Sequence, residues 1–136
     1  MLLRIIHGSP ALAAVSSLLF MVCAISVNIR SSRVWILPMS LSILFLAFSV
    51  GAIAAEGATG FWLEHTRSLW GNQIWFDLLL MCSTSWLLII PRAKAARMKS
   101  WLWLILILCS GSVGMLAMLA RLLFLEERLR VSTGSS

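Results

Sequence analysis

Residues 73–91 read QIWFDLLLMCSTSWLLIIP, and the eight residues that follow, 92–99, carry four positive charges. A helix needs about 20 mostly apolar residues to cross the ~30 Å hydrocarbon core of a bilayer, so this stretch is long enough to span a membrane. Loops that flank such spans on the cytoplasmic side are rich in Lys and Arg, and the basic run is typical of one. A single acid, Asp77, lies within the apolar stretch and requires an explanation.

The whole chain has the composition of a protein that is embedded in lipid. Of its 136 residues, 60% are hydrophobic and 12% are charged, whereas about 25% of the residues of a typical soluble domain are charged. The apolar runs are continuous rather than alternating, which favours membrane helices over a β-barrel. The basic residues that give the chain its net charge of +6 lie beside these runs. Their position therefore indicates contact with anionic lipid head groups rather than with nucleic acid, and the basic residues expected to make that contact are Arg92, Lys94, Arg97 and Lys99.

Four apolar runs predict a single all-α domain over residues 1–136, an antiparallel bundle of four membrane spans at about 11–28, 34–55, 72–91 and 101–125. The short connections force neighbouring spans to run side by side in opposite directions. The last six residues, 131–136, are expected to form a disordered tail. The first run has a second interpretation, because a basic start before an apolar stretch is also typical of a cleaved signal peptide, with Ala24-Ile25-Ser26 as the cleavage site.

The segment between the second and third runs predicts a short helix that lies in the head-group layer. Residues 56–71 read EGATGFWLEHTRSLWG, which places aromatic and apolar side chains on one helical face and charged ones on the other. Tryptophans at this level are typical of the aromatic belt of a membrane protein. They also make candidate substrate-binding residues, together with a threonine of the third span: Trp62, Trp70, Trp75 and Thr84.

The distribution of basic residues predicts an orientation in a membrane, which we expect to be a bacterial inner membrane. The two short connections, 29–33 and 92–100, hold six Lys and Arg residues and no acid. The remaining basic residues lie beside acids and number four or five, depending on where Arg121 is placed. Because Lys and Arg are enriched on the cytoplasmic side, we expect both connections in the cytoplasm and both termini in the periplasm.

Three charged residues near the opposite ends of the runs are candidates for a site. A continuous fourth span would bring Arg121 to the depth of Glu56, about 10 Å from Asp77. Glu56, Asp77 and Arg121 would then form a buried polar cluster beneath the tryptophans. Two interpretations stay open for such a cluster: an ion pair that fixes how the helices dock, or a catalytic, proton-binding or substrate-binding site.

No metal site or cofactor is expected from the cysteines and histidines. Cys23, Cys82 and Cys109 are far apart in the sequence and lie within the apolar runs, with no Cys/His spacing typical of metal ligands. Free cysteines in such positions usually act as small apolar packing residues.

The second half of the chain, residues 64–130, resembles a family of small bacterial integral membrane proteins that are classified as a domain of unknown function. The resemblance lies in Phe76-Asp77-Leu78-Leu79, in Arg92 and Arg97, in Trp101 and Gly114, and in the closing residues 122–128. The family is richer in proline near the end of the last helix, where this chain has Leu119-Ala120-Arg121. The resemblance implies a membrane fold and singles out Asp77; it implies no activity.

Two functions are compatible with these patterns. Four helices in so short a chain bury few side chains, so we expect a non-enzymatic accessory or assembly subunit that packs against a larger membrane complex or against copies of itself. The alternative is a small enzyme or carrier for lipids or isoprenoids that uses Asp77 with Glu56 and Arg121. Trp75-Phe76-Asp77 near a loop acid is similar to a pattern of membrane-bound terpene cyclases, which carries this alternative.

Overall fold

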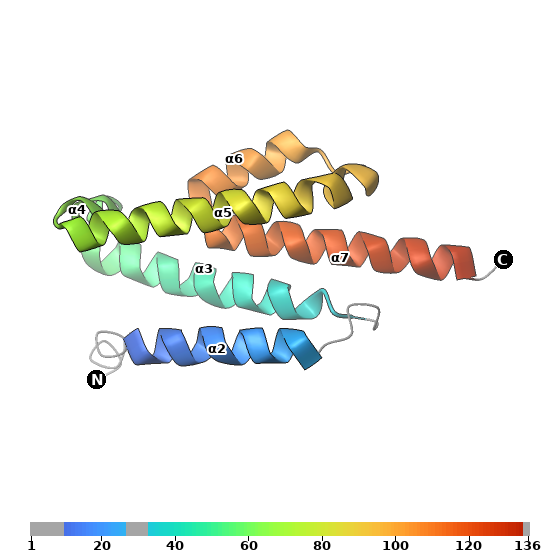
Figure 1. The fold of residues 1–136 in the computed structure, drawn as a ribbon, viewed down its shortest axis with the longest axis horizontal. Helices are drawn as coiled ribbons and strands as arrows, with labels where there is room; N and C mark the ends of the chain where they lie inside the picture. Colours follow the sequence, from blue (N-terminus) through green and yellow to red (C-terminus); the bar gives the residue numbers. More distant parts are fainter. Residues whose placement is uncertain (1–9, 27–32, 135–136) are drawn as a thin grey trace. The chain divides into compact units, whose positions relative to one another are not determined.

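The computed structural model describes residues 10–26 and 33–134, which fold into helices joined by short connections (Figure 1). The chain divides into two compact units, 1–34 and 35–136. The first contains α2 (Pro10–Ser26), and the second contains α3 (Ile36–Glu56), α4 (Gly60–Thr66), α5 (Leu69–Ala95), α6 (Ser100–Ser110) and α7 (Ser112–Gly134). The all-helical class predicted from the sequence is confirmed for the residues described.

Two of these helices, α3 and α5, are long and apolar enough to cross a membrane. They coincide with the predicted second and third spans, and α4 is the short helix predicted between them. The predicted first span corresponds to α2, whose last expected residues, 27–28, lie outside the described part of the chain. A bundle of four spans is not confirmed, because only α3 and α5 among the described helices are candidate spans and the region predicted as the fourth span is divided.

The division of the predicted fourth span, 101–125, occurs at Gly111, which separates α6 from α7. Its backbone angles are φ 57° and ψ −123°, close to those of the first central residue of a type II′ turn, a conformation that glycine adopts without steric cost. The prediction of one continuous helix is therefore wrong. A single glycine in an apolar run does not by itself predict the end of a helix, but here the chain reverses its direction at Gly111.

The reversal folds α6 back along α7 (Figure 1). Ile107 of α6 and Met118 of α7 are buried together with Ala93 of α5, and these residues form the core of the second unit. Gly114 allows the close approach, since a Cβ atom at this position would lie 3.0 Å from the Cα atom of Ile107. The core is thus a three-helix contact between α5, α6 and α7.

Helix α7 runs antiparallel to α3 and packs along it. Ser42 of α3 is buried, and its hydroxyl donates a hydrogen bond of 2.9 Å to the carbonyl oxygen of Val113. Further along, the rings of Trp35 and Phe124 meet edge to face with centroids 5.3 Å apart. Val113, near the start of α7, meets Ser42 within α3, whereas Phe124, further along α7, meets Trp35 just before α3. The two helices therefore point in opposite directions.

The second half of α7 lies beside the end of α5, and the two helices run in the same direction (Figure 1). The guanidinium group of Arg92 donates two hydrogen bonds, of 3.0 and 2.8 Å, to the carboxylate of Glu126. The expectation that the C-terminal end lies opposite the basic connection 92–100 is therefore wrong, because the reversal at Gly111 returns α7 to the basic end. The expected disordered tail is also corrected: α7 continues to Gly134, and only residues 135–136 lie outside the described part.

We predict that Ser42→Ala destabilises the second unit by about 1 kcal/mol, since it removes the buried hydrogen bond between α3 and α7. Thermal unfolding of the full chain in detergent micelles measures the effect. Ser49→Ala is the matched control, because the Ser49 hydroxyl bonds to the carbonyl oxygen of Phe45 within the same helix. Equal unfolding midpoints for the two variants would contradict the packing of α3 on α7.

Candidate functional site

Asp77 is exposed and lies on the side of α5 that points away from the core. The residues of α5 that pack on the core are partly or fully buried and include Cys82, Trp86, Ile89 and Ala93. Trp86 follows Asp77 by nine positions, which corresponds to about 180° around a helix of 3.6 residues per turn. Asp77 therefore lies opposite the packed face. The prediction that its carboxyl group is buried between helices is wrong.

No residue in the described part of the chain forms a hydrogen bond or ion pair with Asp77. Ion pairs there include those of Arg67 with Glu64, and of Arg92 and Arg130 with Glu126. Asp77 is the single acid of α5, so its carboxylate has no counter-charge in this part of the protein.

Glu56 and Arg121 lie far apart, near opposite ends of α3. Glu56 is the last residue of that helix. Arg121 lies on α7 with its guanidinium carbon 5.7 Å from the ring centroid of Phe124, and Phe124 packs on Trp35 at the other end of α3. A helix of 21 residues is about 30 Å long, so the predicted cluster of Glu56, Asp77 and Arg121 does not form. The reversal at Gly111 is again the cause.

The predicted substrate-binding residues do not share a cavity. Trp75 packs against α4, with its ring centroid 5.0 Å from that of His65 and 6.0 Å from that of Phe61. Trp62 and Trp70 are exposed, and the Thr84 hydroxyl donates to the carbonyl oxygen of Leu80 in its own helix. An open depression lies where α4 meets α5, and its lining contains none of these four residues: Thr66, Arg67, Ser68, Leu69 and Asn72.

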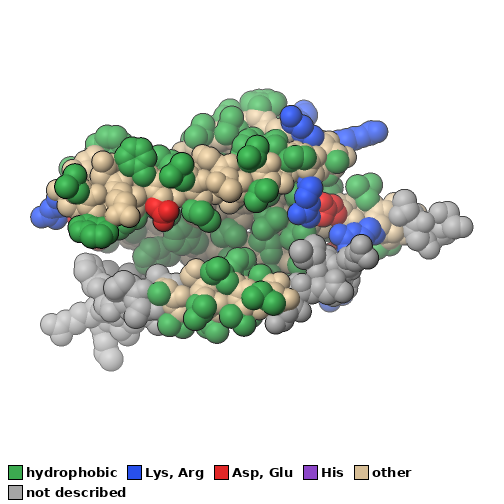
Figure 2. Space-filling view, viewed as in Figure 1, with side chains coloured by type: hydrophobic (Ala, Val, Ile, Leu, Met, Phe, Trp, Pro, Cys, Tyr) green, Lys and Arg blue, Asp and Glu red, His purple; other side chains and the backbone are tan. Residues whose placement is uncertain are grey.

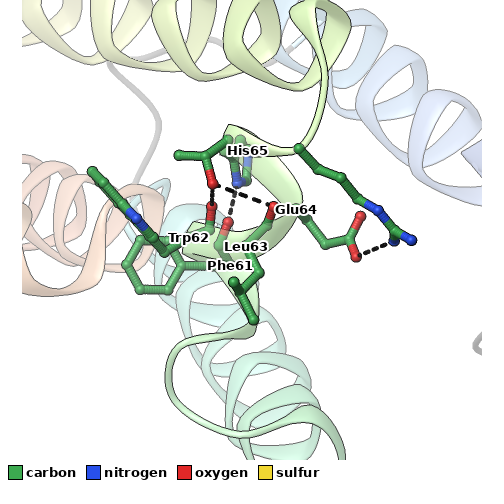
Figure 3. A network of polar contacts seen from close by, with 7 residues as sticks. Phe61, Trp62, Leu63, Glu64 and His65 are labelled. Carbon is green, nitrogen blue, oxygen red and sulfur yellow. Dashed lines mark hydrogen bonds and ion pairs between the residues drawn. The ribbon is translucent and has the colours of Figure 1, made fainter.

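The polar groups of α4 satisfy one another locally (Figure 3). The His65 ring bonds to the carbonyl oxygen of Phe61, and the Thr66 hydroxyl donates to that of Trp62 at 2.8 Å. The next helix begins at once, since the Ser68 hydroxyl accepts the backbone N–H of Gly71 at 3.0 Å. These contacts build a tight corner between two helices.

One cluster of charges was missed from the sequence. The reversal at Gly111 brings the basic residues of α7 to the end of the second unit that already carries those of the basic connection. This basic end comprises Arg92, Lys94, Arg97, Lys99, Arg121, Arg128 and Arg130, with Glu126 and Glu127 among them. Figure 2 shows Lys and Arg side chains gathered there. The Ser110-Gly111-Ser112 run with Gly114 was the signal available in the sequence.

The chain matches no protein-family model, and it has no significant similarity to a curated protein or to a solved structure. The resemblance to the bacterial membrane family of unknown function therefore stays a prediction. The features of the described residues that bear on function are the exposed apolar helices, the uncompensated acid and the basic end.

Proposed function

We propose that the protein is an integral membrane protein and acts as an accessory or assembly subunit by packing against another membrane protein. The observation that carries this proposal is the exposure of large apolar side chains along α3, α5 and α6. They include Leu44, Phe48, Val50, Leu80, Met81, Leu87, Leu88, Trp101, Ile105 and Leu108. Such surfaces require lipid or a protein partner as their surroundings.

The pattern differs from that of a soluble core helix, which is mostly buried. None of the most apolar window of α5 is buried in this structure, and 11% of that of α3 is. The buried apolar residues of the described part are few, and most lie on α7: Ala93, Ile107, Val113, Met118, Ala120 and Leu122. We infer that α3 and α5 cross the bilayer, while α6 and α7 enter it together from the basic end and return.

The basic end supports an orientation for the second unit. Lys and Arg are enriched on the cytoplasmic side of membrane proteins, and acids count little in this rule. The opposite end carries Glu56, Glu64 and Arg67. We therefore infer a cytoplasmic basic end that contacts anionic lipid head groups, each Lys or Arg near the surface contributing about 1 kcal/mol.

The alternative predicted from the sequence, a small enzyme or carrier for lipids or isoprenoids, has no geometric support. It needs Glu56, Asp77 and Arg121 at one site, whereas the length of α3 separates the first from the last. A subunit, in contrast, needs exposed packing surfaces, and these are present on α3, α5 and α6.

Labelling from one side of the membrane tests the proposed embedding. The three native cysteines are replaced by alanine, and single cysteines are introduced as Glu64→Cys, Lys99→Cys and Ser132→Cys. In spheroplasts of an expressing bacterium, we expect an impermeant maleimide to label position 64 and to leave positions 99 and 132 unlabelled until the cells are lysed. Release of the protein by alkaline carbonate, or external labelling at all three positions, would contradict the proposal.

The subunit role has its own measurement. Tagged full-length protein, extracted in mild detergent from the membranes of the cells that naturally make it, is expected to migrate in native electrophoresis as part of an assembly larger than one chain. A lone monomer in native membranes would contradict the role while leaving the embedding intact.

A further inference from the structure

We propose that α5 binds, through a stripe centred on Asp77, a membrane-spanning helix of another protein that carries a Lys or Arg at the depth of Asp77. This inference rests on the proposed function and names the kind of partner. The stripe is defined by six residues of α5: Trp70, Ile74, Asp77, Met81, Thr84 and Leu88. All six are exposed.

The spacing of the stripe matches that of a helix–helix contact. Its members follow one another by alternating steps of four and three residues, the 3.5-residue repeat by which two helices pack along a common seam. A second seam with similar steps runs along the other side of α5 through Cys82, Trp86, Ile89 and Ala93, and this one is packed on α6 and α7. Helix α5 thus has two packing seams, of which the other helices of the second unit cover one.

The charge of Asp77 determines the kind of helix that the stripe would bind. A carboxylate that faces hydrocarbon is costly when ionised and is normally paired or neutralised. Helix α2 contains no Lys or Arg. Arg92 is bound to Glu126, and it lies fifteen positions beyond Asp77, about 22 Å along the helix. Within the described residues the seam therefore offers an acid without a matching base, which a basic residue on a neighbouring helix would complement.

A second copy of this chain does not fit the stripe. Copies with the same orientation in the membrane would place one Asp77 against the other, and none of the six stripe residues is basic. Two carboxylates at one seam repel each other unless one is protonated. A polar residue within an apolar seam also fixes register and partner, so the partner is expected to be a different helix with its cation about 22 Å from the level of Arg92.

The test uses the full-length protein in lipid vesicles and synthetic leucine–alanine spanning peptides of about 22 residues. One peptide carries a single Lys at the depth of Asp77, and a second has Leu there. Energy transfer between labelled protein and labelled peptide gives the association constant. We expect the Lys peptide to bind about tenfold more tightly than the Leu peptide, the preference to disappear in Asp77→Asn, and Asp77→Glu to retain it.

Glu64→Gln is the matched control, because Glu64 is an exposed acid of α4 outside the stripe, and it should leave the preference unchanged. Equal binding of the two peptides, or a preference that survives in Asp77→Asn, would overturn the inference. So would self-association of the wild-type chain that Asp77→Asn abolishes, since a second copy would then be the occupant. Release of the protein from vesicles by alkaline carbonate would overturn the proposed function as well, whereas an embedded chain without the preference overturns this inference alone.

Discussion

Gly111→Ala is expected to join α6 and α7 into one continuous helix and, in the membrane embedding that we propose, to carry the C-terminal end of α7 to the other side of the bilayer. The added Cβ meets no atom within 4 Å, so the effect comes from the backbone alone. Holding alanine at φ 57° costs about 1–3 kcal/mol, and alanine favours a helix interior over glycine by about 1 kcal/mol. Both terms favour a straight helix through 101–125, which is long enough to span a bilayer.

Maleimide labelling of Ser132→Cys in spheroplasts measures this change. We expect labelling from outside in the Gly111→Ala background and protection in the background with Gly111. Gly51→Ala is the matched control, since Gly51 lies within α3, has no contact within 4 Å of its added Cβ and does not require a positive φ. Protection of position 132 in all three backgrounds would show that packing on α3 and α5 holds the reversal without help from glycine.

The positions of α3, α4 and α5 could be predicted because each is a local pattern. The first and last of these are long apolar runs, and α4 has one aromatic face. The reversal at Gly111 could not be predicted in the same way, because a glycine in an apolar run is tolerated in a helix at a cost of about 1 kcal/mol. Its positive φ is stabilised by contacts distant in sequence, such as the hydrogen bond from Ser42 to Val113.

The candidate site shows the same limit. The sequence singled out Asp77 correctly as the acid of an apolar helix, but it placed that residue on the wrong side. A helix that is apolar all round gives no periodic signal that distinguishes its packed face from its exposed face. Trp75 and Trp86 turned out to lie on packed sides, while Trp70 and Leu88 are exposed. Only the tertiary contacts decide between the two faces.

Glu126→Arg is expected to destabilise the second unit by about 2 kcal/mol. It removes the two charge-assisted hydrogen bonds from Arg92, and it places a third guanidinium beside those of Arg92 and Arg130, whose nearest nitrogens lie 2.8 and 3.8 Å from the Glu126 carboxylate. The side chains of Arg92 and Glu126 are 44% and 22% exposed, so water screens this pair less than it screens Arg67 and Glu64, which are 77% and 66% exposed. Chemical unfolding of the full chain in mixed micelles provides the measurement.

The exchange of the two charges separates this contact from a general effect of charge. The double variant Arg92→Glu with Glu126→Arg restores the ion pair with its charges exchanged. We expect it to recover at least half of the stability that Glu126→Arg loses. Independent sites do not show such a coupling. Glu64→Arg is the matched control, because the exposed Glu64 side chain lies 3.4 Å from Arg67. It should lower the free energy of unfolding by less than about 0.5 kcal/mol. If the stability losses of Arg92→Glu and Glu126→Arg simply add in the double variant, α5 and α7 do not meet at these two residues. The parallel arrangement that places the C-terminal end beside the basic connection is then wrong.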